Sequence, residues 1–331
     1  MRIGLVGRND DKGLGNLTRE FFRRLPVTKV LSRYGRAVKS GSTGIPADKL
    51  LRCDNPDEVA EEWVRDIDTL FVLEFARYDR LWSVARDRGI YSVLKVNHEF
   101  LPLIMNGGPD LCLCSSSVNL AAVPDNLSGV LISDPVDTEA ITFRPRKIAW
   151  TFVHNAGTLG IHGANCTQEV LRAIPLVRNR DVRFIVRSQV RLPAHNRDER
   201  TTYQGSVPGV AELYGAGDIF LLPQKFRGTS LPIQEAMAAG MPVLTTDMPP
   251  FNEFCQFFIK PAEISRLSGL YLEREVPAYR VTPEAIASAI DLLAGRRIFA
   301  ESMAARRYAE TISWAALGSK LLRLLTPPRL L

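Results

Sequence analysis

Residues 216–247, AGDIFLLPQKFRGTSLPIQEAMAAGMPVLTTD, carry the strongest signal for both the fold and the function. The apolar run that ends at Pro223 has the length of a buried strand, and a glycine-containing loop follows it. A helix is expected from Leu231 to Gly240, and another buried strand comes next. Strand, helix and strand in this order predict a parallel βαβ unit, which binds ligands at the carboxyl ends of its strands.

The loop and the first turns of this helix offer groups that suit an anion and a diol. Backbone amides at the amino end of a helix attract negative charge. The residues that supply them are Gly228, Thr229, Ser230 and Leu231. The Glu235 carboxylate can accept two hydrogen bonds from vicinal hydroxyls, such as those of a ribose. The alternative for Glu235 is a favourable interaction with the helix dipole alone.

Elsewhere, strands and helices alternate in two series, which predicts two parallel-sheet domains of the α/β class. The join lies in the polar segment 133–147, SDPVDTEAITFRPRK. In a chain of 331 residues, 46% hydrophobic and 24% charged residues indicate a globular protein and exclude a disordered or fibrous one. No apolar stretch approaches the length of a membrane-spanning helix, so none is expected. The five cysteines lack metal-type spacing, which argues against a disulfide framework or a metal site. Cys112 and Cys114 lie in an apolar run and are expected to be buried thiols in a reducing cytoplasm.

Positive charge is concentrated in two segments. The chain carries a net charge of +6, and residues 19–52 hold nine basic and two acidic side chains. Such a patch attracts phosphates, nucleic acid or an acidic membrane face, unless it is merely a solvated surface. We take Arg23, Arg33 and Arg36 as its candidates for contact with an anionic acceptor. Residues 178–200 form a second basic stretch, with seven arginines and three acids.

A glycine-containing loop also follows the first predicted strand. Gly13 and Gly15 lie between the strand RIGLVG and a helix, where glycine lets the backbone approach a ligand. The loop is too long for the three-glycine dinucleotide fingerprint, so a plain turn remains an alternative.

The segment 216–247 resembles the donor site of retaining, nucleotide-sugar-dependent glycosyltransferases of the GT-B fold, family four. The residues that match in order are Asp218, Pro223, Gly228, Leu231, Pro232, Glu235, Ala236, Gly240, Pro242 and Val243. Weaker matches cover nearly the whole chain and include Gly13, Gly15, Asp110, Ser115, Glu253 and TISWAALGSKLL at 311–322.

The resemblance implies two Rossmann-like parallel-sheet domains that face a central cleft. It implies an acceptor-side domain at 1–143, a donor domain at 144–310, and a C-terminal helix at 311–331 that packs back on the first domain. Among the matched residues, Glu253 is expected on the donor side.

The departures from the family pattern fall on the donor site. Arg227 stands where the family has the first glutamate of its pair, which contacts the donor sugar. Asn165 falls near the position of a family lysine that binds the diphosphate, and no arginine accompanies it. Because a diphosphate in a partly desolvated site needs cations or several amides, the replacements at hand are Arg187, Lys225 and Arg227. We interpret the site as rebuilt; the alternative is a site without activity.

Histidines and acids near strand ends are the remaining candidates. His98 and Glu99 follow the strand YSVLKV, where a side chain can hydrogen-bond a sugar hydroxyl; a structural histidine is the alternative. Glu74 is a weaker candidate of the same kind. His154 and His162 lie on the expected donor side and are candidates for phosphate contact.

The resemblance therefore implies a metal-independent retaining transferase that moves a sugar from a nucleotide-sugar, expected to be a UDP-sugar, to a hydroxyl acceptor. No bound cofactor is expected. Three alternatives stay open: a transferase acting on a hydroxymethylated DNA base, an inactive protein that binds glycan or nucleic acid, and an isomerase-type use of the fold. The sequence names neither the donor sugar, the acceptor nor the oligomeric state.

Overall fold

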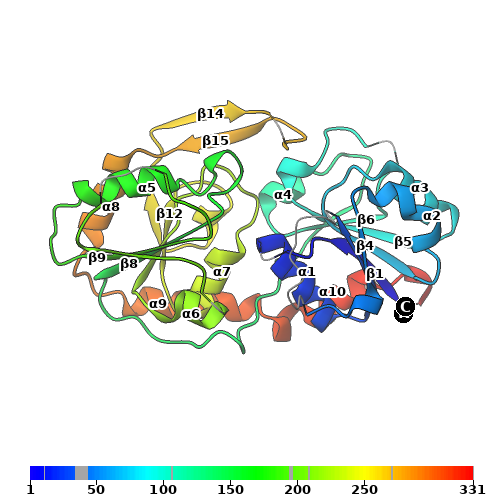
Figure 1. Ribbon diagram of the computed structural model, residues 1–331, viewed down its shortest axis with the longest axis horizontal. Coiled ribbons are helices and arrows are strands. Elements are labelled where there is room, and N and C mark those ends of the chain that lie inside the picture. Colours follow the sequence, from blue (N-terminus) through cyan, green and yellow to red (C-terminus); the bar gives the residue numbers. More distant parts are fainter. Residues whose placement is uncertain are drawn as a thin grey trace. The chain divides into compact units, whose positions relative to one another are not determined.

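The chain folds into two compact units, each with its own parallel sheet (Figure 1). The structure is a computed structural model that describes residues 1–10, 12–33, 44–105, 107–193, 197–207, 209–269 and 271–330. Unit 1 comprises Met1–Ser133, Leu272–Arg274 and Leu317–Leu331, and unit 2 comprises Asp134–Tyr271 and Glu275–Ala316. Two Rossmann-like parallel-sheet units confirm the predicted α/β class. No helix of the described residues is long and apolar enough to span a membrane.

Unit 1 is built on a seven-stranded parallel sheet in the order β3-β2-β1-β4-β5-β6-β7. Its strands are β1 (Ile3–Gly7), β2 (Val27–Arg33), β3 (Leu50–Cys53), β4 (Thr69–Glu74), β5 (Tyr91–Val96), β6 (Leu111–Cys114) and β7 (Gly129–Leu131). The central strands are apolar and buried because helices cover both faces of the sheet. Cys112 and Cys114 are buried within β6, as predicted, and burial raises the pKa of each thiol to about 12.

The helices that pack in unit 1 are α1 (Gly13–Arg24), α2 (Ala60–Trp63), α3 (Asp79–Asp87), α4 (Ser117–Ala121) and α10 (Trp314–Leu325), of which α10 begins in unit 2. In α1, the buried side chains recur at helical spacing, with Leu17 and Phe21 inward. Phe21 packs on Phe71 of β4 with ring centroids 5.3 Å apart. On the same strand, the Thr69 hydroxyl donates to the carbonyl of Leu325 in α10 at 2.8 Å.

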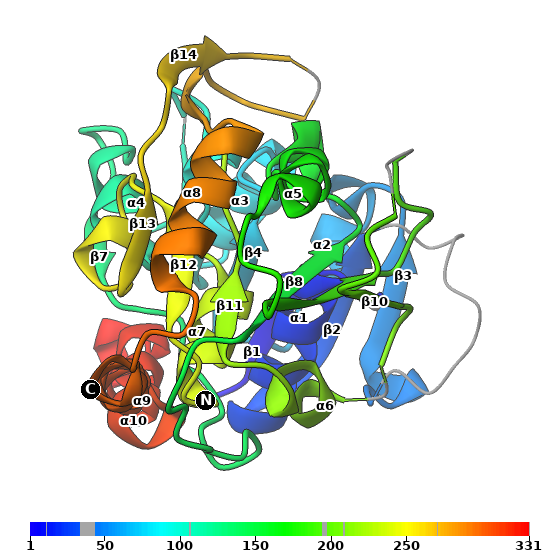
Figure 2. The same ribbon diagram turned by 90° about the vertical axis from the view of Figure 1, so that its left-hand side faces the viewer.

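Unit 2 is built on a six-stranded parallel sheet in the order β10-β9-β8-β11-β12-β13. Its strands are β8 (Thr151–Gly157), β9 (Arg183–Ser188), β10 (Thr201–Gln204), β11 (Ile219–Leu221), β12 (Val243–Thr246) and β13 (Phe257–Ile259). Its helices are α5 (Thr167–Ala173), α6 (Val210–Gly215), α7 (Leu231–Ala238), α8 (Pro283–Leu293) and α9 (Phe299–Thr311). Helices α5 and α8 cover one face of the sheet, and α6, α7 and α9 cover the other (Figure 2).

The segment 216–247 forms β11, a loop, α7 and β12, and β11 pairs with β12 in parallel, as predicted. Gly240 ends the helix with φ +80°, a conformation that suits glycine. A Cβ there would also lie 2.8 Å from the carbonyl oxygen of Arg144, so only glycine fits without a shift of the backbone.

Some elements were not evident from the sequence. The edge strands β3 and β10 are short and half exposed, so they lack a continuous apolar run. The antiparallel hairpin of β14 (Glu263–Leu267) and β15 (Val276–Arg280) pairs outside both parallel sheets. The helical pattern from Glu284 to Leu325 divides into α8, α9 and α10, and Gly295, with φ +75°, lies in the break after α8.

Candidate functional site

Helix α7 places Glu235 beside a buried tyrosine. Most of this helix is buried, and Glu235 is its one acidic residue, partly exposed in the second turn. The Tyr214 hydroxyl donates to Oε2 of Glu235 at 2.8 Å, across 21 residues of sequence. Tyr214 is only 1% exposed, and burial, together with the charge of Glu235, raises its pKa well above the usual value of 10. The phenol therefore stays protonated and acts as a donor at neutral pH.

Three arginines fix the end of α6 that carries Tyr214. Arg187 donates from Nη1 to the carbonyl of Leu213 at 2.7 Å, and Arg146 donates from Nη2 to the carbonyl of Tyr214 at 2.7 Å. Arg144 donates to the carbonyl of Gly215 at 3.4 Å. Carbonyls at the end of a helix lack intrahelical partners and carry partial negative charge, which cationic donors satisfy. No pattern in the sequence signals this role, because the donors come from β9 and from residues 144–146.

Arg187, near the end of β9, uses its side-chain donors for hydrogen bonds within unit 2. Its side chain is buried, and its Nε donates to Oε1 of Gln204 at 2.7 Å. Burial lowers the pKa of Arg187, as it lowers that of Arg146 to about 10, so Arg146 keeps its charge at neutral pH. Arg187 therefore holds the backbone of Leu213, the residue before Tyr214, and Tyr214 in turn holds Glu235.

The loop between β11 and α7 is anchored at both ends. The amide of Lys225 donates to the carbonyl of Ala164 at 2.9 Å, and its Nζ donates to the carbonyl of His162 at 3.1 Å. Near α7, the Thr229 hydroxyl donates to the Asp134 carboxylate at 3.2 Å. The Arg227 guanidinium lies 5.7 Å from the ring of Phe226. The sequence-predicted Lys225, Arg227, Gly228, Thr229, Ser230 and Leu231 thus share one loop and the start of one helix.

The neighbouring loop, between β8 and α5, turns sharply and holds Asn165. Positive φ values occur at Gly157, Leu159, Gly160, His162, Gly163 and Cys166. Asn165 donates from Nδ2 to the carbonyl of Ala156 at 3.1 Å, which ties the loop to the end of β8. Because Lys225 bonds Ala164 and His162, the structure brings Asn165 and Lys225 into adjoining loops.

His154 is a structural residue, and the expectation that it contacts phosphate is wrong. It is 1% exposed, with Nδ1 2.9 Å from the carbonyl oxygen of Leu221 and Nε2 2.9 Å from the Thr167 hydroxyl. Burial lowers its pKa to about 4, so the ring is neutral at physiological pH. His154 therefore joins β8 to β11 and α5. Glu253, also expected on the donor side, is exposed in a 3-10 turn after β12.

In unit 1, His98 and Glu99 form a buried pair at the carboxyl end of β5. His98 Nδ1 lies 3.2 Å from Oε2 of Glu99, and both side chains are buried. The His98 amide donates to Oδ1 of Asn119, whose Nδ2 donates to the carbonyl of Val96 and the Ser115 hydroxyl. Asn119, which sequence reasoning missed, thus ties the ends of β5 and β6 together. The pair sits in a preorganised polar region where parallel strands end.

Three other positions near the strand ends of unit 1 differ in their local surroundings. A Cβ on Gly15 would lie 1.9 Å from the carbonyl oxygen of Asp10, so the close approach there is made by the chain's own backbone. Gly13, where α1 begins, has open space around the same position. Glu74 adopts φ +66° at the end of β4, a conformation that is costly for a residue with a Cβ and that concentrates at functional sites.

The basic residues of the first segment differ in their surroundings. Arg23 is 63% exposed and forms an ion pair with Glu20. The Arg33 guanidinium lies 4.8 Å from the centre of the Phe75 ring, which places it beside the carboxyl end of β4. Arg36 lies outside the described residues.

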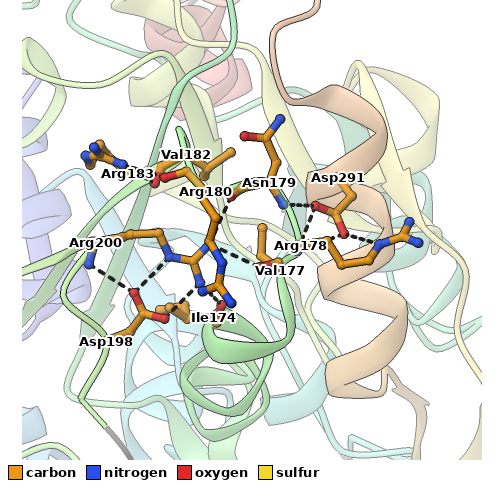
Figure 3. A network of polar contacts seen from close by, with 10 residues as sticks. All are labelled: Ile174, Val177, Arg178, Asn179, Arg180, Val182, Arg183, Asp198, Arg200 and Asp291. Atoms are coloured by element: carbon orange, nitrogen blue, oxygen red, sulfur yellow. Dashed lines mark hydrogen bonds and ion pairs between the residues drawn. The ribbon is translucent and has the colours of Figure 1, made fainter.

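Part of the second basic stretch serves the fold (Figure 3). Arg200 is buried between the Asp198 carboxylate, 2.8 Å away, and the carbonyls of Ile174, Val177 and Asn179. This pairing lowers the pKa of Asp198 and raises that of Arg200. Asp291 of α8 accepts from the side chain and the amide of Arg178. The anion-attracting charge of residues 178–200 is therefore smaller than its arginine count suggests.

Comparison with known proteins supports a specific fold. Residues 156–266 match the family model described as glycosyl transferases group 1. This range contains the β8–α5 loop, the β11–α7 loop, Tyr214 and Glu235. The sequence matches no curated protein.

Solved structures of other proteins share the two-sheet fold of this chain. HepE from Anabaena, in complex with UDP and glucose, is 12% identical, with a TM-score of 0.68 over 98% of this chain and 99% of HepE. Sucrose-phosphate synthase from Thermosynechococcus elongatus is 10% identical, with a TM-score of 0.61 over 98% of both chains. The lipopolysaccharide outer core galactosyltransferase WaaB is 12% identical, with a TM-score of 0.61 over 97% of this chain and 98% of WaaB. The shared two-sheet architecture shows that this chain has the GT-B fold of these proteins, and residues 156–266 are similar to glycosyl transferases group 1.

Proposed function

We propose that the protein is a retaining glycosyltransferase that moves a sugar from a UDP-sugar to a hydroxyl acceptor. The observation that carries the proposal is the Glu235 carboxylate on α7, partly exposed and held by Tyr214 within the segment that matches the family model. A carboxylate at this place can accept hydrogen bonds from both ribose hydroxyls of a nucleotide. HepE, which shares the fold, has been solved in complex with UDP-glucose, and this favours uridine as the base.

The leaving diphosphate would be held by the β11–α7 loop. Its negative charge grows as the bond to the anomeric carbon lengthens, and fixed cations and amides stabilise that charge better than water does. We assign this role to Lys225, Arg227 and the amides of Gly228–Leu231, which lie on one anchored loop. Asn165, on the adjoining loop, would complete the donor side. Arg227 would take the place of the family's first glutamate by binding phosphate or an acidic sugar.

Arg187 would support this site without contacting the nucleotide. Two of its donor nitrogens already serve Gln204 and Leu213, so we assign it to the support of α6 and not to direct contact with phosphate. Glu253 stays a proposed donor contact. Gly13 and Gly15 remain proposed donor-side residues, although Gly15 also has the packing role described above.

We assign acceptor binding to residues of unit 1 and the main donor contacts to residues of unit 2. For retention of configuration, the acceptor hydroxyl attacks the anomeric carbon from the face that the diphosphate leaves. The acceptor oxygen forms the new bond, the old bond breaks with its electron pair on the diphosphate, and the diphosphate takes the proton. No dedicated base or metal ion is required in this scheme. His98 and Glu99 would orient the hydroxyl from the end of β5. A cytoplasmic location, where nucleotide-sugars are available, remains a prediction.

A panel of nucleotide-sugars tests the proposal. Binding of a ligand to the folded state raises its apparent stability by mass action, so the cognate nucleotide should raise the melting temperature. We expect a rise with UDP and with at least one UDP-sugar, and slow hydrolysis of that sugar without acceptor. Retention is read from the anomeric configuration of the product by NMR. No stabilisation by any uridine nucleotide would contradict the choice of donor.

A further inference from the structure

We infer that Tyr214 is a positioning residue whose hydroxyl presets the Glu235 carboxylate for the ribose hydroxyls of the donor. The inference rests on the proposed function, because it takes Glu235 as the ribose-binding group. Tyr214 is itself buried and does not need to touch the nucleotide. It acts through the 2.8 Å hydrogen bond from its hydroxyl to Oε2 of Glu235.

The direction of this hydrogen bond is fixed. Burial and the negative charge of Glu235 raise the pKa of Tyr214 well above 10, so the hydroxyl keeps its proton and Glu235 is the acceptor. Hydrogen bonds to an ionised acceptor are shorter and stronger than those between neutral groups. One carboxylate oxygen of Glu235 is thereby held at a defined place.

The tyrosine cannot readily move away from the carboxylate. Its carbonyl accepts from Arg146, and the carbonyl before it accepts from Arg187. Its ring meets Phe220 of β11 edge to face, with centroids 5.6 Å apart and an interplanar angle of 77°. Buried arginines and a buried aromatic contact therefore fix the residue at its backbone and at its ring.

The benefit of such an arrangement is preorganisation. A partly exposed glutamate on a helix samples several rotamers, and binding must select one of them. A hydrogen bond from a rigid donor makes that selection before the ligand arrives, so less of the binding free energy is lost to ordering. The effect should appear only with ligands that use the carboxylate, which are those with ribose hydroxyls.

The test compares UDP with 2′,3′-dideoxy-UDP by calorimetry. The wild-type protein should bind UDP more tightly, and the affinity ratio measures the ribose contribution. Tyr214→Phe keeps the ring but removes the hydroxyl. We expect it to reduce the ratio about tenfold, mainly by weakening UDP, because a hydrogen bond to a charged group contributes about that factor or more. Tyr203→Phe removes a hydroxyl from β10 in the same unit and should leave both affinities unchanged.

Equal weakening of UDP and of 2′,3′-dideoxy-UDP by Tyr214→Phe would mean that the hydroxyl serves the fold alone, and would overturn the inference. No preference for UDP in the wild-type protein would overturn the ribose assignment of Glu235, which is a separate failure. In the Glu235→Ala background, Tyr214→Phe should have no further effect on the affinity ratio.

A second variant serves if Tyr214→Phe does not fold. Glu235→Asp keeps the negative charge but shortens the side chain, which draws the carboxylate out of reach of Tyr214. Full preference for UDP over 2′,3′-dideoxy-UDP in that variant would also refute the inference.

Discussion

Arg187 donates from Nη1 to the carbonyl oxygen of Leu213 at 2.7 Å, so an arginine at the end of β9 holds the last turn of α6. An arginine at the carboxyl end of a strand in this fold is a natural candidate for phosphate contact. In the structure, however, its side chain donates to the Leu213 carbonyl at the end of α6 and to the Gln204 side chain. The two roles make different predictions about ligands.

For Arg187→Ala we expect the free energy of unfolding to fall by about 2–4 kcal/mol, because two acceptors are deprived of a charged donor. If Arg187 only supports α6, its removal should weaken UDP and uridine by the same factor, since both carry the ribose. Calorimetry with the two ligands, and urea unfolding, measure these effects. A weakening confined to UDP would instead make Arg187 a ligand of the diphosphate.

Glu235→Ala should weaken UDP by about 1.5–3 kcal/mol for each ribose hydrogen bond that is removed, while the fold survives. Glu284→Ala is a matched control, because Glu284 is an exposed acid in the first turn of α8 in the same unit. Isothermal calorimetry with UDP gives both values. Unchanged affinity in a folded Glu235→Ala protein would end the ribose assignment and would favour the helix-dipole explanation.

Arg227→Ala should lower kcat by about 10- to 100-fold and affect uridine binding far less, since charge on the leaving group is greatest in the transition state. Arg183→Ala, an arginine of β9 whose side chain donates to backbone carbonyls, is the control. Arg227→Glu restores the residue type of the family pattern and should not restore activity. Higher activity of Arg227→Glu would show that the family's sugar-binding glutamate was lost and that Arg227 has not taken on a new role in binding phosphate or sugar.

Because His154 is buried in its neutral form, the free energy of unfolding should decrease in mild acid. The pKa of His154 is about 4 in the folded protein and about 6.5 when unfolded, so between these values the unfolded state binds more protons. Stability therefore falls as the pH drops below 6.5 and levels off below 4, with a decrease of about 2 kcal/mol between pH 7 and pH 5.

Urea unfolding at pH 7 and pH 5 measures this decrease, and His154→Gln removes the titrating group. We expect the variant to be less stable at pH 7 but to show a much smaller difference between the two pH values. The pairing of Asp198 with Arg200 stabilises the fold above the ordinary carboxyl pKa and weakens at lower pH, so it contributes little within this window. Equal pH dependence of the two proteins would contradict the assignment.

The basic segment 19–52 is tested with charge reversals. If an anionic acceptor binds there, Arg23→Glu with Arg33→Glu should weaken acceptor binding and leave UDP binding intact. Lys320→Glu, an exposed cation on α10 in unit 1, is the control. With duplex DNA, the slope of log K against log salt should shrink by about 0.9 for each phosphate that the variant no longer neutralises. No DNA binding at low salt would exclude DNA and favour a glycan or lipid-linked acceptor.

The predictable part of the site is local in sequence. The βαβ unit at 216–247 could be predicted because strand length, helix spacing and the glycine at the helix end all lie within one short segment. The same local logic placed Glu235 on a helix after a buried strand, and His98 and Glu99 after another. The glycine pattern marks Gly15 as a place of close approach, but the group that lies there, the carbonyl of Asp10, is not visible in that pattern.

The fold class, the two series of strands and helices, and the loop and helix that offer Glu235 all follow from the order of residues along the chain. That Tyr214 holds Glu235, that Arg187 supports α6, and that His154 links strands became evident only in three dimensions. Buried polar groups must find partners wherever the sheet order brings them. Because strand β8 lies between β9 and β11, side chains that are remote in sequence become neighbours. The periodicity of residues along the chain does not predict which of them meet.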